Sequence, residues 1–231
     1  MKLSPNVDKE LTIVVGGKTY ERWPIKTHVI TDKDDIVDVV KSYAVEHLQK
    51  GDMLFMSERV VAITQGRSIP IADIVPSKLA KFLVRFVYKS PYGIGLGSPW
   101  TMQLALDEVG MFRILFASLV AAVTKPFGIR GMFYRIAGRK IAAIDGPCDY
   151  TLPPYNKNAT LAPKFPHKVA KSIQKEIGNE IVIIDANDLG VDILGVSNNQ
   201  ANKEELAAIF KDNPLGQSSE QTPLCVVRLQ M

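Results

Sequence analysis

The chain has 231 residues, of which 46% are hydrophobic and 23% are charged, a composition that excludes a disordered protein and supports a buried core. The formal net charge of +4 comes from Lys and Arg spread along the sequence, which suits an anionic small molecule as well as it suits nucleic acid. Aromatic residues are not interleaved with the basic ones as base-stacking surfaces require, so we expect no nucleic-acid partner.

The lack of an evident signal peptide and the small number of cysteines predict a cytoplasmic protein. The start of the sequence is polar, and the two cysteines, Cys148 and Cys225, lack metal-type spacing. The most apolar run, Met111–Val123, contains Arg113 and is followed by Lys125. It is shorter than the roughly 20 residues that a membrane-spanning helix needs. We therefore expect no membrane partner, and we predict a buried helix or a helix at a subunit interface.

The first part of the chain predicts two strands and a helix. Leu11–Val15 has the pattern of a strand, and a glycine pair that predicts a turn follows it. Trp23–His28 is predicted to be an extended loop. Apolar residues at helical spacing predict a helix over Asp34–Gln49, and a strand is expected at Asp52–Met56.

The middle of the chain predicts helices and a hairpin. Ile74–Tyr88 is expected to be helical after its proline. The glycine-rich segment Pro91–Pro99 ends in Ser98, which suits a helix N-cap. Such a loop either holds an anion or serves as a plain connection, and both interpretations stay open. The runs Met132–Ile136 and Arg139–Ile144 are predicted to form a β-hairpin.

The last part of the chain alternates helices and strands. His167–Ile177 and Lys203–Lys211 have helical periodicity, whereas Ile181–Ile184 and Leu224–Leu229 are continuous apolar runs typical of buried strands. Strands and helices are therefore intermixed along the chain. This predicts the α/β class (mixed α+β), with mixed sheets and flanking helices.

Acidic and amide side chains follow directly after the Ile181–Ile184 strand. They are Asp185, Asn187 and Asp188, and Gly190 then breaks the segment. Such oxygens at the end of a buried strand cost desolvation energy unless something offsets it, and Mg²⁺ or Mn²⁺ prefers oxygen ligands. An ordinary polar turn with an Asx cap explains the same pattern. The stretch alone leaves both interpretations open.

Five segments share their order and spacing with one enzyme family. They are Pro24–Ile25, Gly51–Arg67, Ile144–Asp145, Ala186–Gly190 and Gly216–Pro223. With these segments the chain resembles the coenzyme F420-0:γ-glutamyl ligase family over most of its length. The resemblance implies a single ligase-like domain over residues 1–231 with a γ-glutamyl-ligase-like fold. The exception is an apolar helical insert at about residues 89–130.

The chemistry of that family would suit these residues. The resemblance implies a ligase that adds L-glutamate to a carboxylate of a small molecule, such as a coenzyme F420 precursor. GTP would first convert the carboxylate into an acyl phosphate, which the amine of glutamate would then attack. Mg²⁺ or Mn²⁺ would neutralise the phosphoryl oxygens. The resemblance also implies a homodimer, and it names no catalytic side chain.

The resemblance gives two sets of site residues. The expected metal ligands, which Asp185 would assist, are Asp145, Asn187, Asp188 and Gln217. The expected nucleotide or cofactor contacts are Pro24, Ile25, Arg59, Arg67, Cys148, Gly216 and Ser218.

Three positions depart from the family pattern. Ile63 stands where the family has a lysine, Cys148 where it has an asparagine, and Asn187 where it has an aspartate. Arg59 and Arg67 are the nearby cations that would meet a phosphate instead, or else are solvated surface charges. The departures leave two alternatives open. One is a non-catalytic homologue that binds a nucleotide or an anionic small molecule, and the other is a folate-type glutamate ligase.

Overall fold

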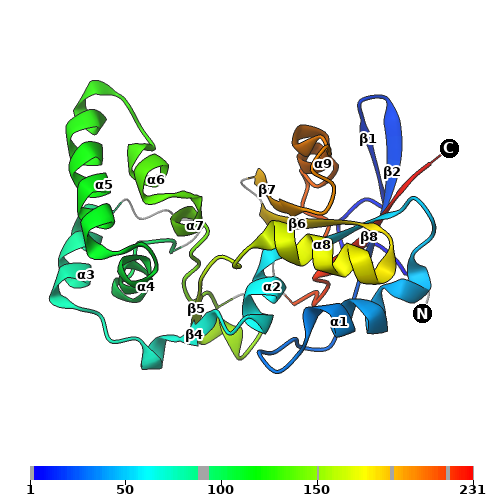
Figure 1. Ribbon diagram of the computed structural model, residues 1–231, viewed down its shortest axis with the longest axis horizontal. Helices are drawn as coiled ribbons and strands as arrows, with labels where there is room; N and C mark the ends of the chain where they lie inside the picture. Colours follow the sequence, from blue (N-terminus) through cyan, green and yellow to red (C-terminus); the bar gives the residue numbers. More distant parts are fainter. Residues whose placement is uncertain (1–2, 88–93, 150, 188–189, 217–218, 231) are drawn as a thin grey trace. The chain divides into compact units, whose positions relative to one another are not determined.

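The computed structural model describes residues 3–87, 94–149, 151–187, 190–216 and 219–230 (Figure 1). The chain divides into two compact units. Unit 1 consists of Met1–Gly66 and Pro163–Met231, and unit 2 consists of Arg67–Ala162. The expectation of a single ligase-like domain over residues 1–231 stays a prediction.

Unit 1 is built on a six-stranded sheet in the order β1-β2-β8-β3-β6-β7. Its strands are β1 (Thr12–Val15), β2 (Lys18–Ile25), β3 (Met53–Ser57), β6 (Glu180–Asn187), β7 (Gly190–Val196) and β8 (Leu224–Leu229). Strands β3 and β6 pair in parallel, and the other neighbours in this sheet are antiparallel. With its flanking helices, this mixed sheet confirms the predicted fold class.

Helices cover both faces of this sheet. They are α1 (Ile36–Tyr43), α2 (Glu58–Thr64), α8 (Pro166–Ile177) and α9 (Lys203–Ile209), with the 3₁₀ helix η1 (Val45–His47) after α1. On one face, the ring of Phe55 stacks on that of Phe210, next to α9, at a centroid distance of 4.2 Å. Alternate residues of a strand point to opposite faces, so Leu54 and Met56, both fully buried, point to the other face. The helix α8 packs on β6 and β7.

Side-chain caps fix where the helices of unit 1 begin. The carboxylate of Asp35 accepts from the backbone N–H groups of Val37 and Asp38 at the start of α1. The side chain of Asn202 accepts from two N–H groups at the start of α9, as its sequence position predicts. The helix α1 is shorter than the predicted Asp34–Gln49, because the chain continues as η1 rather than as α-helix.

Unit 2 is mainly helical. Its α-helices are α3 (Lys78–Leu83), α4 (Pro99–Val109), α5 (Met111–Thr124), α6 (Met132–Ala137) and α7 (Arg139–Ala142). The 3₁₀ helices are η2 (Ile71–Asp73), η3 (Val84–Phe86), η4 (Lys125–Phe127) and η5 (Tyr155–Lys157), and the strands are β4 (Ser68–Pro70) and β5 (Asn158–Thr160). The predicted N-cap Ser98 is confirmed, since its hydroxyl accepts from the N–H of Thr101 in a capping box. Residues 91–93 of the glycine-rich loop lie outside the described residues.

The predicted hairpin over Met132–Ile136 and Arg139–Ile144 is wrong. These residues form α6 and α7, which Gly138 separates at a φ of 104°. Short apolar runs fit a strand and a buried helix equally well, so packing decides between them. Here α6 packs on α5, and Ile141 and Ile144 enter the core of unit 2.

Two other expectations change as well. The predicted loop Trp23–His28 begins inside β2, because a tight turn at Gly16 and Gly17 folds this strand back onto β1. Met111–Val123 is a helix, but it is not a buried one. On α5 only Ile114 and Ala117 are buried. Among the described helices, none is both long enough and apolar enough to cross a membrane.

The chain leaves unit 1 and returns to it at neighbouring positions. The side-chain amide of Gln65 donates to the carbonyl of Lys164 at 3.0 Å, and the N–H of Lys164 donates back to the Gln65 side chain at 2.6 Å. Within unit 2, the N–H of Leu161 donates to the carbonyl of Arg67 at 2.9 Å, and β4 pairs with β5. The first and last residues of unit 2 therefore run side by side.

Candidate functional site

One edge of the sheet in unit 1 gathers the ends of several strands. Both Ile25, the last residue of β2, and Met56 near the end of β3 pair with Leu224, the first residue of β8. Ser57 at the end of β3 pairs with Ile184 of the parallel strand β6. The segments that follow β2, β3 and β6 therefore meet the segment that precedes β8 at the same edge of the sheet.

The first segment at this edge contains the predicted contacts Pro24 and Ile25. Both are buried within β2, where Pro24 pairs with Cys225. Just beyond them, the N–H of Thr27 donates to the carbonyl of Gln221, and the side chain of Gln221 donates to the carbonyl of Thr27 at 2.6 Å. This pair of hydrogen bonds ties the end of β2 to the segment that leads into β8.

The second segment passes from β3 directly into α2. The N–H of Ser57 donates to the carbonyl of Pro223 at 2.9 Å, and the hydroxyl of Ser57 caps α2 by accepting from the N–H of Arg59. Arg59 is half-buried and lies in the first turn of α2, so its backbone is next to this edge of the sheet. That position is compatible with the predicted phosphate contact.

The third segment is the acidic end of β6. The strand does not end at Ile184 but continues through Asn187, so its polar side chains lie on a strand rather than in a turn. Asp185 and Asn187 are both half-buried, and alternation places them on the same face of the sheet. Asp192 of β7 pairs with Asp185 and adds a second carboxylate to that face. Asp192 was not among the predicted site residues, although a predicted hairpin register would have found it.

The fourth segment carries the predicted residue Gly216. Its φ is 77°, and a Cβ atom there would lie 2.7 Å from Cγ of Glu220, so this position requires glycine. The side chain of Asn213 donates to the carbonyl of Gly216 at 3.1 Å. The predicted residues Gln217 and Ser218 lie outside the described residues, as does Asp188.

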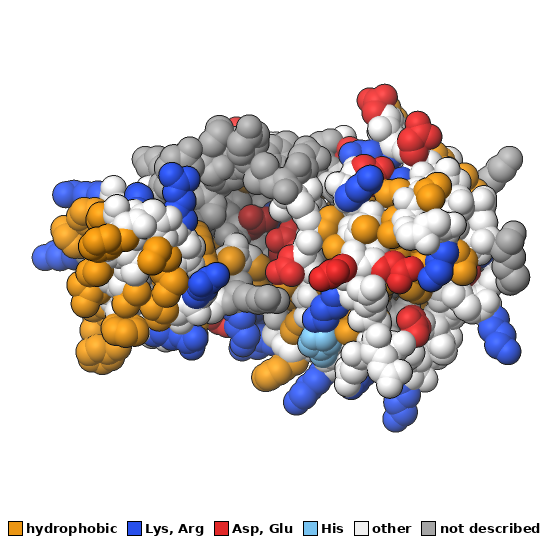
Figure 2. All heavy atoms as spheres, turned by 90° about the horizontal axis from the view of Figure 1, so that it is seen from above, with side chains coloured by type: hydrophobic (Ala, Val, Ile, Leu, Met, Phe, Trp, Pro, Cys, Tyr) orange, Lys and Arg blue, Asp and Glu red, His pale blue; other side chains and the backbone are white. Residues whose placement is uncertain are grey.

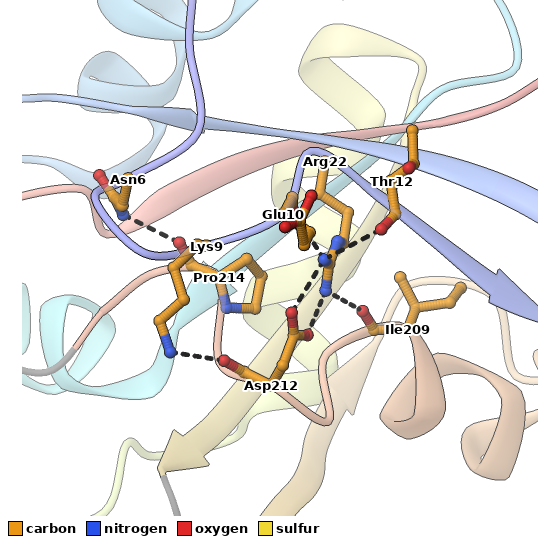
Figure 3. A network of polar contacts seen from close by, with 8 residues as sticks. All are labelled: Asn6, Lys9, Glu10, Thr12, Arg22, Ile209, Asp212 and Pro214. Atoms are coloured by element: carbon orange, nitrogen blue, oxygen red, sulfur yellow. Dashed lines mark hydrogen bonds and ion pairs between the residues drawn. The ribbon is translucent and has the colours of Figure 1, made fainter.

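A buried arginine anchors the chain just before Gly216 (Figure 3). The guanidinium of Arg22 donates to both carboxylate oxygens of Asp212 and to the carbonyls of Ile209 and Glu10. Burial raises the pKa of Asp212, but the hydrogen bond and the charge of Arg22 outweigh this, and the pKa lies below its ordinary value. The sequence gives no sign of this pair, because 190 positions separate its members.

The N-terminal segment braces the same region (Figure 3). The ammonium group of Lys9 donates to the carbonyl of Asp212 at 2.7 Å, and the side chain of Asn6 donates to the carbonyl of Pro214 at 2.8 Å. Asn6 also donates to the hydroxyl of Thr222 at 2.8 Å. The segment on either side of residues 217–218 is thus held by side chains from the start of the chain.

Three further predicted site residues lie in unit 2. Asp145 is exposed and forms a pair of backbone hydrogen bonds with Thr160, each 2.9 Å long. Cys148 is half-buried in the turn that follows. Arg67 is only 6% exposed, so it is not a solvated surface charge.

The guanidinium of Arg67 is engaged within unit 2. Its Nε donates to the carbonyl of Ala162 at 2.6 Å, and its Nη2 lies 3.0 Å from a carboxylate oxygen of Glu108. Both members of this ion pair are largely buried. Removing Arg67 would therefore leave the Glu108 carboxylate without its partner in unit 2.

The donors at hand suit a hard cation by their chemistry. Asp145, Asp185 and Asn187 supply carboxylate and amide oxygens, which Mg²⁺ and Mn²⁺ prefer. Within the described ranges, no three His, Cys, Asp or Glu side chains gather as a metal site. Asp145 belongs to unit 2, whereas Asp185 and Asn187 belong to unit 1. Their joint role as metal ligands stays a prediction.

The comparison with protein families identifies the chain. The family model of F420-0:γ-glutamyl ligase matches residues 24–189, which is more than half of the sequence. The match begins within β2, spans all of unit 2 and ends after β6. No curated protein matches the sequence. The chain therefore belongs to the F420-0:γ-glutamyl ligase family.

Proposed function

We propose that the protein adds L-glutamate to a carboxylate of a small molecule of the F420-0 type, with GTP as co-substrate and Mg²⁺ or Mn²⁺ as cofactor. Membership in the family carries this proposal. The sheet edge of unit 1 supports it, because Arg59 follows β3 there and the polar residues Asp185 and Asn187 lie in the last part of β6. We also propose that the protein is a homodimer, as the resemblance implies.

The proposed reaction has two steps. An oxygen of the acceptor carboxylate attacks the terminal phosphorus of GTP, and GDP leaves. The amine of glutamate then attacks the acyl carbon, phosphate leaves, and the nitrogen loses a proton to give the amide. A bound divalent cation would neutralise the phosphoryl oxygens, and Asp145, Asp185, Asn187, Asp188 and Gln217 would hold it.

Arg59 is the better candidate for the phosphate contact in this scheme. The side chain of Arg67 is 6% exposed and lies against Glu108, so a phosphate has little access to it. Arg59 is half-buried and stands at the start of α2, next to the end of β3. A charge-assisted hydrogen bond from Arg59 to a phosphate would contribute about 1.5–3 kcal/mol to nucleotide affinity.

The decisive experiment detects the product. The protein is incubated with L-glutamate, Mn²⁺, GTP or ATP, and either an F420-0-type or a folate-type acceptor, and mass spectrometry reports gain of one glutamyl group. We expect glutamylation of the F420-0-type acceptor with GTP. Glutamylation of the folate acceptor alone would support the folate-type ligase instead.

A nucleotide titration completes this test. Wild-type protein and the Arg59→Ala variant are titrated with GTP in the presence of Mn²⁺, and Arg85→Ala serves as a control for loss of an arginine elsewhere. We expect Arg59→Ala alone to weaken binding. No product and no binding at millimolar GTP would leave the non-catalytic homologue as the better interpretation.

A further inference from the structure

The outward side of α5 carries several large apolar side chains. Ile114 and Ala117 are fully buried and face the core of unit 2. Phe112, Phe116 and Leu119 recur at helical spacing on the other side, where they are 83%, 59% and 62% exposed. A helix that is apolar all round is normally buried all round. The described structure covers only one side of α5.

The exposed apolar surface continues beyond the helix (Figure 2). Eight large apolar side chains between residues 111 and 129 are exposed, and together they define the α5 face: Met111, Phe112, Leu115, Phe116, Leu119, Val123, Phe127 and Ile129. Single exposed apolar residues are common on protein surfaces, but a contiguous set of this kind marks a contact site.

The charged residues within α5 and after it, up to Ile144, all have one sign. Residues 109–144 contain six Arg or Lys residues and no Asp or Glu, so this stretch carries +6. The whole chain carries only +4, and the rest of it has 22 basic against 24 acidic residues. Arg113, Lys125, Arg130, Arg135 and Lys140 are exposed. Figure 2 shows Lys and Arg side chains at the edge of the hydrophobic cluster.

We propose that the α5 face rests on the surface of a lipid bilayer that contains anionic lipids. Aromatic and aliphatic side chains would enter the boundary between headgroups and acyl chains, while the surrounding Lys and Arg would meet the anionic headgroups. The 14 residues of α5 reach only about 21 Å, less than the roughly 30 Å of a hydrocarbon core. The helix would therefore lie along the membrane surface. Such surface binding is distinct from spanning the membrane, for which Met111–Val123 is too short.

Charge favours this occupant over a second copy of the chain. Two α5 faces brought together would place two positively charged rims against each other, which costs free energy unless counterions or acidic groups intervene. The described part of the chain offers no acidic residue between positions 109 and 144 to offset that repulsion. An anionic bilayer supplies both the apolar layer and the opposite charge.

Co-sedimentation with vesicles tests the proposal. The intact protein is mixed with vesicles of phosphatidylcholine alone or with added phosphatidylglycerol, at low and at high salt. We expect binding to the anionic vesicles that weakens as salt rises, because salt screens the headgroup charges. The double variant Phe112→Ser/Phe116→Ser should lower the partition coefficient at least about tenfold, because two rings no longer enter the bilayer.

Matched variants separate the apolar from the electrostatic contribution. Lys125→Gln/Arg130→Gln should weaken binding at low salt and have little effect at high salt. The controls are Phe165→Ser, which removes an exposed ring from unit 1, and Lys171→Gln/Lys175→Gln, which removes two exposed charges from α8. Both controls should bind as the wild type does, and circular dichroism verifies that each variant is folded.

Three outcomes would overturn the proposal. The first is no binding of folded wild-type protein to anionic vesicles. The second is binding that Phe112→Ser/Phe116→Ser leaves unchanged. The third is light scattering that shows a dimer which this double variant dissociates, since the face would then join two copies. None of these measurements depends on ligase activity, so they stand apart from the test of the proposed function.

Discussion

The two units of this chain differ in how they treat polar and apolar side chains. Unit 1 covers both faces of its sheet and pairs its most buried charge, Arg22, with Asp212 and with the carbonyls of Ile209 and Glu10. Unit 2 also pairs its buried Arg67, but it leaves one side of α5 exposed. The difference shows that a compact core does not require a fully polar surface, and that an uncovered apolar helix is a local property of one unit.

The largest expected effect comes from breaking the buried ion pair of unit 1. Asp212→Asn should lower the free energy of unfolding of unit 1 by about 3 kcal/mol, because Arg22 stays buried without a negative partner. The estimate is at the low end for such a change, since 37% of the Asp212 side chain is exposed. Because the pKa of Asp212 is lowered, this contribution should be lost as pH falls below about 4.

The two tryptophans let each unit be measured by itself. Trp23 lies in β2 of unit 1, and Trp100 lies in α4 of unit 2. Urea unfolding is followed by fluorescence in two backgrounds, Trp100→Phe and Trp23→Phe. Asp212→Asn should shift the Trp23 transition, whereas Glu108→Gln, the matched change in unit 2, should shift the Trp100 transition. Equal shifts of both transitions in both variants would show that the two units do not unfold independently.

The second prediction asks whether the two units share a metal ion. Asp145→Ala should weaken Mn²⁺ binding at least about tenfold, because it removes a charged ligand. Asp185→Asn in unit 1 should weaken binding too, since it also removes a charge. Calorimetry measures both, with the exposed Asp73→Ala as the control for loss of a carboxylate in unit 2. Equal affinity in the wild type and in Asp145→Ala would remove unit 2 from the site.

The smallest expected effect concerns a single hydroxyl in unit 1. Tyr20 is 4% exposed and donates to Glu205 at 2.7 Å, and burial together with this carboxylate raises the pKa of Tyr20 to about 12. Tyr20→Phe should cost about 1 kcal/mol at pH 8. The unfolded tyrosine ionises near pH 10, so the advantage of the wild type should shrink between pH 10 and about 12. Urea unfolding of both proteins across this range provides the check, and a constant difference would contradict it.

The sequence predicted the elements whose pattern is local and strong. The continuous apolar runs at Ile181–Ile184 and Leu224–Leu229 lie in β6 and β8, and Leu11–Val15 contains β1. Strand β2 was not predicted, because Lys18, Glu21 and Arg22 conceal its alternation, and its end was assigned to the loop Trp23–His28. In unit 2, packing rather than periodicity decided that Met132–Ala137 and Arg139–Ala142 are helices.

The candidate site shows the same limit. Residue types alone selected Asp185 and Asn187, and the sheet places both on one face at the edge that Arg59 also reaches. Asp192 emerges only from the pairing register of β6 and β7. The Arg22–Asp212 pair depends on tertiary contact between distant segments, which no spacing rule encodes.

The paired hydrogen bonds between Gln65 and Lys164 have a consequence for chain connectivity. They hold together the two points of unit 1 between which unit 2 lies in the sequence. The entropy cost of bringing the two ends of this long loop together is therefore met within unit 1. The closure cost grows only with the logarithm of loop length, so a short Gly/Ser linker in place of Arg67–Ala162 would not raise it. Such a deletion should leave a continuous chain that contains all six strands of the large sheet. The sheet of unit 1 and the helices of unit 2 can thus change independently of each other during evolution.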